Sequence, residues 1–342
     1  MFKTINKIKI SIGALLLLSA FSVVAIIYKT KQTSPVDTPL APLTPKIPDY
    51  IKQPLSIDML EVDKNSFNFP LKLPLLKQEG LSPISETRIK SIADNLGFSS
   101  DPVFANDAVN GIVNIWNNKD NFLIITPKIR KIKFGPASNP QREIANALNK
   151  QLSEKDIVSS AENFLIDKIG LDKSSLVFAN IVYLQMQTGL ELFKETGKKD
   201  STIFQVNFSY SGSPYPILTL EPQSTVVYVQ ILKDGSVLNS EINLVNNFSA
   251  GLTEHKLKSY EEVAGSLDRA ILVSLNDGNI NLPDLKKDDL SKISINEIQL
   301  AYLLDTPLSE YLQPVFVLKG TASISGSGIP VNADFFLPAF SN

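Results

Sequence analysis

The hydrophobic and polar residues divide the chain into an apolar N-terminal segment, a proline-rich stretch and a long body of mixed character. The apolar segment covers residues 10–28, begins at Ile10, ends at Tyr28 and contains no charged residue. As an α-helix it would measure about 28 Å, and the hydrocarbon core of a bilayer is about 30 Å thick. The pattern therefore predicts a transmembrane signal-anchor helix whose partner is the lipid bilayer.

The charges around this segment predict its orientation. Lys3, Lys7 and Lys9 precede it, and basic residues are enriched on the cytoplasmic side of spanning helices. We therefore expect a cytoplasmic tail over residues 1–9 and an extracytoplasmic body, in a single-pass protein of the cell membrane. The alternative is a secretory signal peptide that is cleaved near Ala25, which would release the same body as a secreted protein.

A proline-rich linker is predicted over residues 29–54. Its prolines recur every few residues, which disfavours a helix and favours an extended, polyproline-like chain. Such a chain would hold the folded body away from the bilayer.

Helical patterns recur in the body. In each, a residue able to cap a helix precedes apolar residues at helical spacing, and glycine follows at Gly97 and Gly170. The predicted caps are Ser82, Ser153 with Asp156, and Ser259 with Glu262, and a shorter helix is predicted over residues 140–148.

Strand-like stretches follow these helices and are separated by short polar turns. Residues 117–120 and Asp234-Gly235 are typical of β-hairpin turns. Runs of strands after a helix favour an α+β fold with antiparallel sheets. We therefore expect three tandem modules, each a helix packed on an antiparallel sheet, over residues 55–138, 139–250 and 251–342.

Composition narrows the chemistry of the body. The chain has 342 residues, no cysteine and one histidine, which excludes disulfides, thiolate metal sites and multi-histidine zinc sites. Five lysines and no acids lie within the first 31 residues of a chain whose formal net charge is −2, so the remainder is acidic. An acidic body predicts no nucleic-acid partner, because phosphate contacts require clustered Lys and Arg.

Catalytic motifs are absent from the sequence. A Ser-His-Asp arrangement would have to use His255, and a surface role for this histidine is the simpler interpretation. No phosphate-binding glycine loop or nucleophile elbow occurs. We expect no cofactor, no metal and no enzymatic activity, with a carboxylate-dependent hydrolase as an alternative because paired acids cannot be recognised from sequence.

One local concentration of positive charge occurs in the body. It contains Lys128, Arg130, Lys131 and Lys133. Lysines on an edge strand prevent aggregation between sheets, which is the simpler explanation. The alternative is an exposed anion-contact face that binds an envelope polymer or another ligand.

Residues 150–338 resemble a known family. The stretches that carry the resemblance are Ile298-Gln299-Leu300-Ala301-Tyr302, residues 311–320 from Tyr311 to Gly320, Val331-Asn332-Ala333 and the turn Gly212-Ser213-Pro214. They resemble the closing module of the YycI and YycH proteins and, more loosely, PepSY-type domains. The resemblance implies a membrane-anchored, non-enzymatic regulator of a membrane sensor kinase, or for PepSY-type domains an interaction with a peptidase.

Together these observations predict an exported, non-catalytic interaction region. It would act as a regulator or scaffold through contacts with an unknown membrane or envelope protein.

Overall fold

The computed structural model describes residues 45–49, 51, 54–138, 140–147, 152–186, 193–220, 225–245, 248–275, 282–306, 308–324 and 330–341. The predicted spanning segment over residues 10–28 lies outside these ranges, as does most of the predicted linker. Within the described ranges, no helix is both long enough and apolar enough to cross a bilayer.

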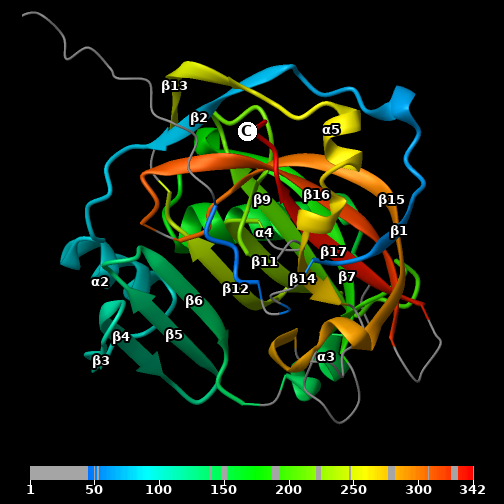
Figure 1. Cartoon of the computed structure of the whole chain (residues 1–342). Coiled ribbons are helices and arrows are strands. Elements are labelled where there is room, and N and C mark those ends of the chain that lie inside the picture. Colours follow the sequence, from blue (N-terminus) through cyan, green and yellow to red (C-terminus); the bar gives the residue numbers. More distant parts are fainter. Residues whose placement is uncertain are drawn as a thin grey trace, which may run out of the picture. The chain divides into compact units, whose positions relative to one another are not determined.

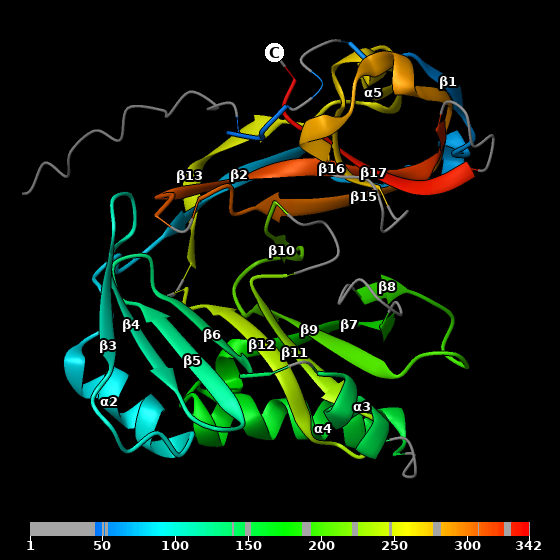
Figure 2. The same cartoon turned by 90° about the horizontal axis from the view of Figure 1, so that it is seen from below.

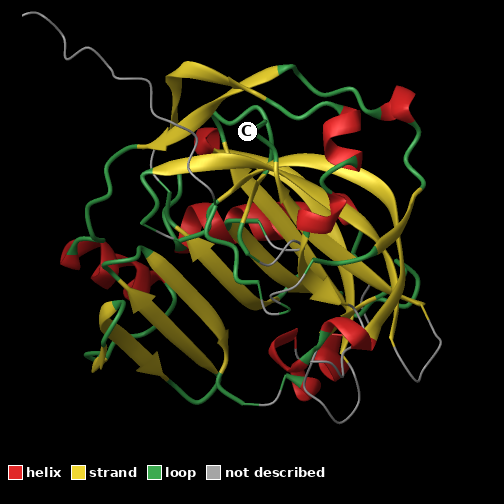
Figure 3. Ribbon diagram, viewed as in Figure 1, coloured by secondary structure: helices red, strands yellow, loops and turns green. Residues whose placement is uncertain are grey.

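The α+β class predicted from the sequence is confirmed. Two large sheets with mostly antiparallel pairing account for most of the structure, and the helices are few and short (Figures 1 and 3).

The first sheet contains nine strands, all paired antiparallel. In spatial order they are β3 (Val103–Asp107), β4 (Gly111–Asn117), β5 (Asn121–Thr126), β6 (Lys131–Pro136), β12 (Val237–Asn243), β11 (Val227–Leu232), β9 (Ile203–Tyr210), β7 (Leu176–Met186) and β8 (Phe193–Glu195).

The second sheet contains eight strands. Two of its pairings, those of β1 and β10 with β15, are parallel. Its main path is β1 (Ile57–Leu60), β15 (Leu290–Leu303), β16 (Tyr311–Ile324), β17 (Pro330–Pro338) and β14 (Ile271–Leu275), joined by β2 (Lys72–Gln78), β13 (Phe248–Lys256) and β10 (Ile217–Leu218).

The predicted helices are present, with adjusted limits. Ser153 and Ser259 cap their helices as predicted, and the capping box of Ser259 with Glu262 is complete. The first helix begins later, because Ser85 and not Ser82 caps it. The helices are α2 (Glu86–Asn95), α3 (Gln141–Ala147), α4 (Glu154–Asn163) and α5 (Tyr260–Ala264), with short 3-10 or π turns η1 (Lys64–Ser66), η2 (Phe164–Lys168), η3 (Lys173–Ser175), η4 (Leu267–Arg269), η5 (Leu282–Asp284) and η6 (Lys287–Asp289).

Helix α5 is shorter than the apolar spacing predicts. Apolar residues continue at helical spacing from Val263 through Leu267 to Ile271, but Gly265 ends the helix and Ile271 begins strand β14. Glycine is the poorest helix former apart from proline, so it stops a helix that has only one turn of packing behind it.

The nine-stranded sheet lies between helices α2 and α4 on one face and the eight-stranded sheet on the other (Figure 2). The apolar stripe of α4 includes Ile157 and Ala161, which are fully buried against β9 and β11. The central strand β9 is buried along its whole length. Its helix-facing residues are apolar, whereas Gln205 and Asn207 on the other face hydrogen-bond to each other.

Strand pairing does not follow the three predicted modules. Strand β6 pairs with β12, which joins residues of the first predicted module to the second. Strands β1 and β2 pair with β15 and β16 and so join the first module to the third. Local hydrophobic patterns predict strands but not distant partners, so the boundaries at 138 and 250 do not coincide with the division between the two sheets.

The described end of the predicted linker is attached to the folded body. The backbone N–H of Lys46 donates to the carboxylate of Asp305 at 2.8 Å, and Ile47 packs against the cluster that contains Val315 and Phe336. Residues 45–49 therefore belong to the folded part and not to a free tether.

Candidate functional site

The four residues of the predicted anion-contact face do not share one exposed surface. Lys131 and Lys133 lie on β6, and both form ion pairs with Glu241 of β12, at 2.9 Å for Lys133. Strand β6 is an interior strand between β5 and β12, so the explanation that these lysines protect a sheet edge is wrong. Both ammonium groups therefore pair with a single carboxylate on the neighbouring strand.

Arg130 ends the turn between β5 and β6 and is buried, with 3% of its surface exposed. One guanidinium nitrogen donates to the backbone carbonyl of Gly80 at 3.1 Å, and its Nε has no hydrogen-bond partner among the described residues. Its backbone is left-handed, with φ of 54°. Non-glycine residues rarely adopt this conformation, so the surroundings hold Arg130 in place.

Lys128 supports a different element, the turn between β3 and β4. Its ammonium group donates to the carbonyl of Val109 at 3.0 Å. Within this turn the carboxylate of Asp107 accepts the backbone N–H groups of Val109 and Asn110, both at 2.8 Å, and these bonds hold the pKa of Asp107 below its usual value. Gly111 completes the turn with φ of 79°. The β3–β4 hairpin is therefore held in one conformation.

Large apolar side chains are exposed on this hairpin. Val103, Phe104, Val109 and Ile112 are 70%, 68%, 76% and 59% exposed. We call these four residues the hairpin surface, in which Phe104 and Ile112 share one face of the hairpin and Val103 lies on the other. Strand β3 is at one end of the nine-stranded sheet, and every one of its residues is exposed (Figure 2).

A cavity of about 430 Å³ adjoins the hairpin surface, between β3, β4 and helix α2. Phe104 lines it together with Trp116 and Ile89. Trp116 is buried, and its indole N–H donates to the carbonyl of Ser100 at 3.0 Å, so it packs as part of the cavity wall. Glu86, Asp94 and Asp101 also line this cavity, against one cation, Lys90.

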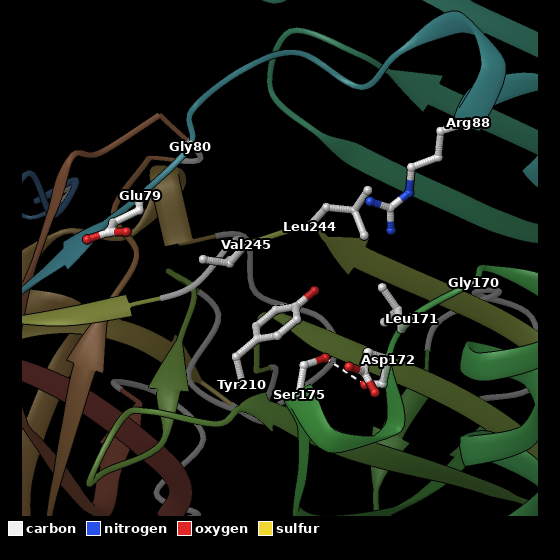
Figure 4. Close-up of a pocket in the computed structure, with 10 residues that line it drawn as sticks. All are labelled: Glu79, Gly80, Arg88, Gly170, Leu171, Asp172, Ser175, Tyr210, Leu244 and Val245. Atoms are coloured by element: carbon white, nitrogen blue, oxygen red, sulfur yellow. Dashed lines mark hydrogen bonds between the residues drawn. The ribbon is translucent and has the colours of Figure 1, made fainter.

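A second cleft, of about 500 Å³, lies on another side of helix α2 (Figure 4). It is lined by Glu79, Gly80, Arg88, Gly170, Leu171, Asp172, Ser175, Tyr210, Leu244 and Val245. These residues come from the end of β2, from α2, from the segment between η2 and β7, and from the ends of β9 and β12. No sequence pattern brings these segments together, so the cleft is visible only in the structure.

Tyr210 forms part of the wall of this cleft. Its hydroxyl donates to the carbonyl of Asn243 at 3.1 Å, and burial raises its pKa to about 12, so it is neutral near pH 7. Glu79 and Asp172 lie on opposite sides of the cleft, and Glu79 is directed away from its centre (Figure 4). The two carboxylates therefore do not face each other as a hydrolytic pair would.

His255 is placed by strand β13, beside Phe340, with 5.0 Å between the ring centroids. Its Nε2 is buried and makes no hydrogen bond with the described residues. Across the described ranges, no three His, Asp or Glu side chains gather in a way that could hold a metal ion.

The hairpin surface was not predicted from the sequence. The sequence does contain a signal for it. The apolar pair Val103-Phe104 is followed by Asp107 and, four residues later, by Gly111, an order typical of an apolar strand that leads into a turn stabilised by an aspartate.

Comparisons with known proteins give no family. No family model and no curated protein matches the chain. Among solved structures, the crystal structure of an uncharacterized protein from Eubacterium rectale ATCC 33656 aligns with a TM-score of 0.44 and 10% sequence identity, over 79% of this chain and 84% of that chain. At this level the likeness says nothing about function, and the resemblance to YycI, YycH and PepSY-type proteins stays a prediction.

Proposed function

We propose that this protein is a membrane-anchored regulator or scaffold whose body acts through protein contacts, and that the hairpin surface is its docking site. The exposed apolar hairpin at a sheet edge is the observation that carries the proposal. Phe104 and Ile112 project from the same face of this hairpin, because Ile112 pairs with Asn106, two residues after Phe104. Sheet edges are normally protected by charge or by covering segments, and exposed apolar side chains beside such an edge indicate a binding role.

The local geometry favours a partner segment that adds to the sheet. An edge strand offers unpaired backbone groups, and neighbouring pockets give such binding its specificity. Strand β3 supplies the edge, while Phe104 and the cavity beside Trp116 supply a pocket. The acids around this cavity favour a segment with apolar and basic side chains.

The membrane location belongs to the same proposal. It rests on the apolar run from Ile10 to Tyr28 and on the lysines that precede it. The resemblance of residues 150–338 to YycI and YycH proteins supports a regulator of a membrane protein over a soluble carrier.

The predicted alternatives have less support. Binding of an envelope polymer relied on four basic residues on one exposed face, and Arg130 is buried while Lys131 and Lys133 are paired with Glu241. A carboxylate hydrolase needs two facing acids, which the cleft of Figure 4 does not offer.

The test is site-specific photo-crosslinking of the full-length protein in its native membrane. A photoreactive residue at position 112 should capture one membrane or envelope protein, and Phe104→Ser should abolish that product. Phe178→Ser is the matched control, because Phe178 is also exposed but lies on β7, far along the sheet order from β3.

The outcomes separate clearly. Loss of the product with Phe104→Ser and its retention with Phe178→Ser supports docking at the hairpin surface. Equal loss with both variants, or no specific product from position 112, contradicts it.

A further inference from the structure

Behind the wall of the cleft of Figure 4 lies a buried guanidinium, that of Arg130, which has no ionic partner among the described residues. No acid among the described residues lies within ion-pair distance of Arg130, and a buried charge without compensation is strongly unfavourable. An anion bound in the adjoining cleft would supply the missing charge.

Arg130 lies directly behind the wall of the cleft. Its guanidinium donates to the carbonyl of Gly80, and its own carbonyl accepts the N–H of Leu244, and both partners line the cleft. Its charge also acts on Tyr210, the aromatic wall residue. The buried guanidinium therefore contributes positive potential to this space.

Arg88 adds a second guanidinium from helix α2. Its side chain and the Tyr210 hydroxyl are directed toward the same space (Figure 4). Its charge also acts on Tyr210, which places it near the same wall as Arg130. Arg88 forms no ion pair with any described residue, so its donors are available to a ligand.

The other lining residues indicate which groups a ligand of this cleft would have beside a negative charge. Leu171, Leu244 and Val245 present apolar surface beside the arginines. Asp172 forms no ion pair with a described arginine, and its carboxylate accepts the backbone N–H of Ser174 at 2.9 Å. A cleft of about 500 Å³ is within the range of small-molecule sites, roughly 300–1,000 Å³.

We propose that this cleft binds small molecules that carry an oxyanion, either a carboxylate or a phosphate ester, next to a short apolar group, with Arg88 and Arg130 providing the positive charge. Guanidinium groups match both oxyanions through paired N–H donors. This inference does not depend on the proposed docking function, because none of these residues belongs to the hairpin surface.

The test is isothermal titration calorimetry of the full-length protein at pH 7.5 and constant ionic strength. The probes are pentanoate, butyl phosphate and, as the uncharged control, 1-pentanol. We expect saturable binding of at least one anion with a Kd of about 1 mM or tighter, and no comparable binding of pentanol. Preference for pentanoate or for butyl phosphate identifies which oxyanion the site takes, and either result supports the proposal.

Variants locate the site. Arg88→Gln should weaken anion binding about tenfold or more, because it removes a charge-assisted contact. Arg88 is exposed on α2, so this change does not disturb the core. Arg269→Gln removes an exposed arginine from η4 and should leave the affinity unchanged.

Several results would overturn the proposal. These are no saturable binding of either anion, equal binding of pentanol, an Arg88→Gln variant that binds as tightly as the unmodified protein, or an equal loss with Arg269→Gln. Crosslinking at position 112 serves as an independent readout, so failure here is distinguishable from failure of the docking function.

Discussion

Asp334 tests how strongly burial in the eight-stranded sheet opposes the ionisation of a carboxylate. It lies on β17, opposite Lys319 of β16 and Ser274 of β14. Burial raises its pKa from the usual 3.8 to about 6, and the negative charges of Glu195 and Glu297 oppose the compensating effect of Lys319. The folded protein therefore holds the proton of Asp334 more tightly than the unfolded chain does.

The sign of the effect on stability follows from this difference. Because the folded pKa is higher than the unfolded pKa, ionised Asp334 destabilises the fold, and the loss develops as pH rises from 3.8 through 6. Above pH 6 the cost is at most about 3 kcal/mol, since one pKa unit corresponds to 1.36 kcal/mol. The side chain keeps partial contact with water, which lowers the cost below that limit.

The assay is urea unfolding of the full-length protein and of Asp334→Asn, followed by circular dichroism at pH 4.0, 6.0 and 7.5. We expect Asn to stabilise the protein by about 1–3 kcal/mol at pH 7.5, with the advantage shrinking to a few tenths at pH 4. Asp200→Asn, an exposed control in the turn after β8, should change stability by less than about 0.5 kcal/mol at every pH. A difference between Asp334→Asn and the unmodified protein that does not vary with pH would refute this reasoning.

Three further predictions concern packing, buried polar contacts and capping. Gly320→Ala should destabilise the protein by more than about 2 kcal/mol in thermal unfolding, because a Cβ there would lie 1.8 Å from the carbonyl oxygen of Ser294, whereas Gly197→Ala, with open space around it, should have little effect. Gln205→Leu should cost about 1–3 kcal/mol in urea unfolding because it removes the 3.0 Å bond from buried Gln230, and the double variant with Gln230→Leu should recover most of that loss; no recovery would contradict the reasoning. Ser259→Ala should cost about 0.5–1 kcal/mol by the same measurement, since it removes the cap of α5, and an unchanged midpoint would show that packing alone holds this helix.

Local features of the fold were predictable because the residues that cause them are neighbours in sequence. Ser153 caps α4 through the backbone N–H of Asp156, and Gly235 takes φ of 89° in the turn between β11 and β12. The turn between β4 and β5 forms because the Asn118 side chain accepts the N–H groups of Asp120 and Asn121. Each of these features needs only a few consecutive residues.

Features that depend on distant segments were not predictable. Strand β2 contains Pro74, a residue that argues against a strand, and it is tolerated where the register with β13 is irregular. The partner of β6 lies about a hundred residues later in the chain, so the sequence pattern left β6 open to interpretation as an edge strand. The eight-stranded sheet combines strands from both ends of the body, which no local periodicity reveals.

The positions of individual side chains were also not predictable, as the four basic residues between Lys128 and Lys133 show. The sequence groups its four cations by proximity along the chain, but the turn before β6 separates their roles. Lys128 supports the hairpin turn, Arg130 is buried behind the cleft, and Lys131 and Lys133 both pair with Glu241. The four residues therefore do not form a single anion-contact face. Lys128 supports the hairpin that we propose as a docking site, and the buried Arg130 lies behind the cleft that we propose as an anion site.

Helix α2 is the element that both proposed sites share, and its two sides explain why they can be tested separately. Ile89 and Ala93 face the cavity beside the hairpin surface, whereas Arg88 faces the cleft of Figure 4. The helix is capped by Ser85 and packs through buried Ile92, so neither site sets its position. A change at Arg88 therefore removes charge from the cleft without moving the wall of the neighbouring cavity, and anion binding and partner docking should respond independently to it.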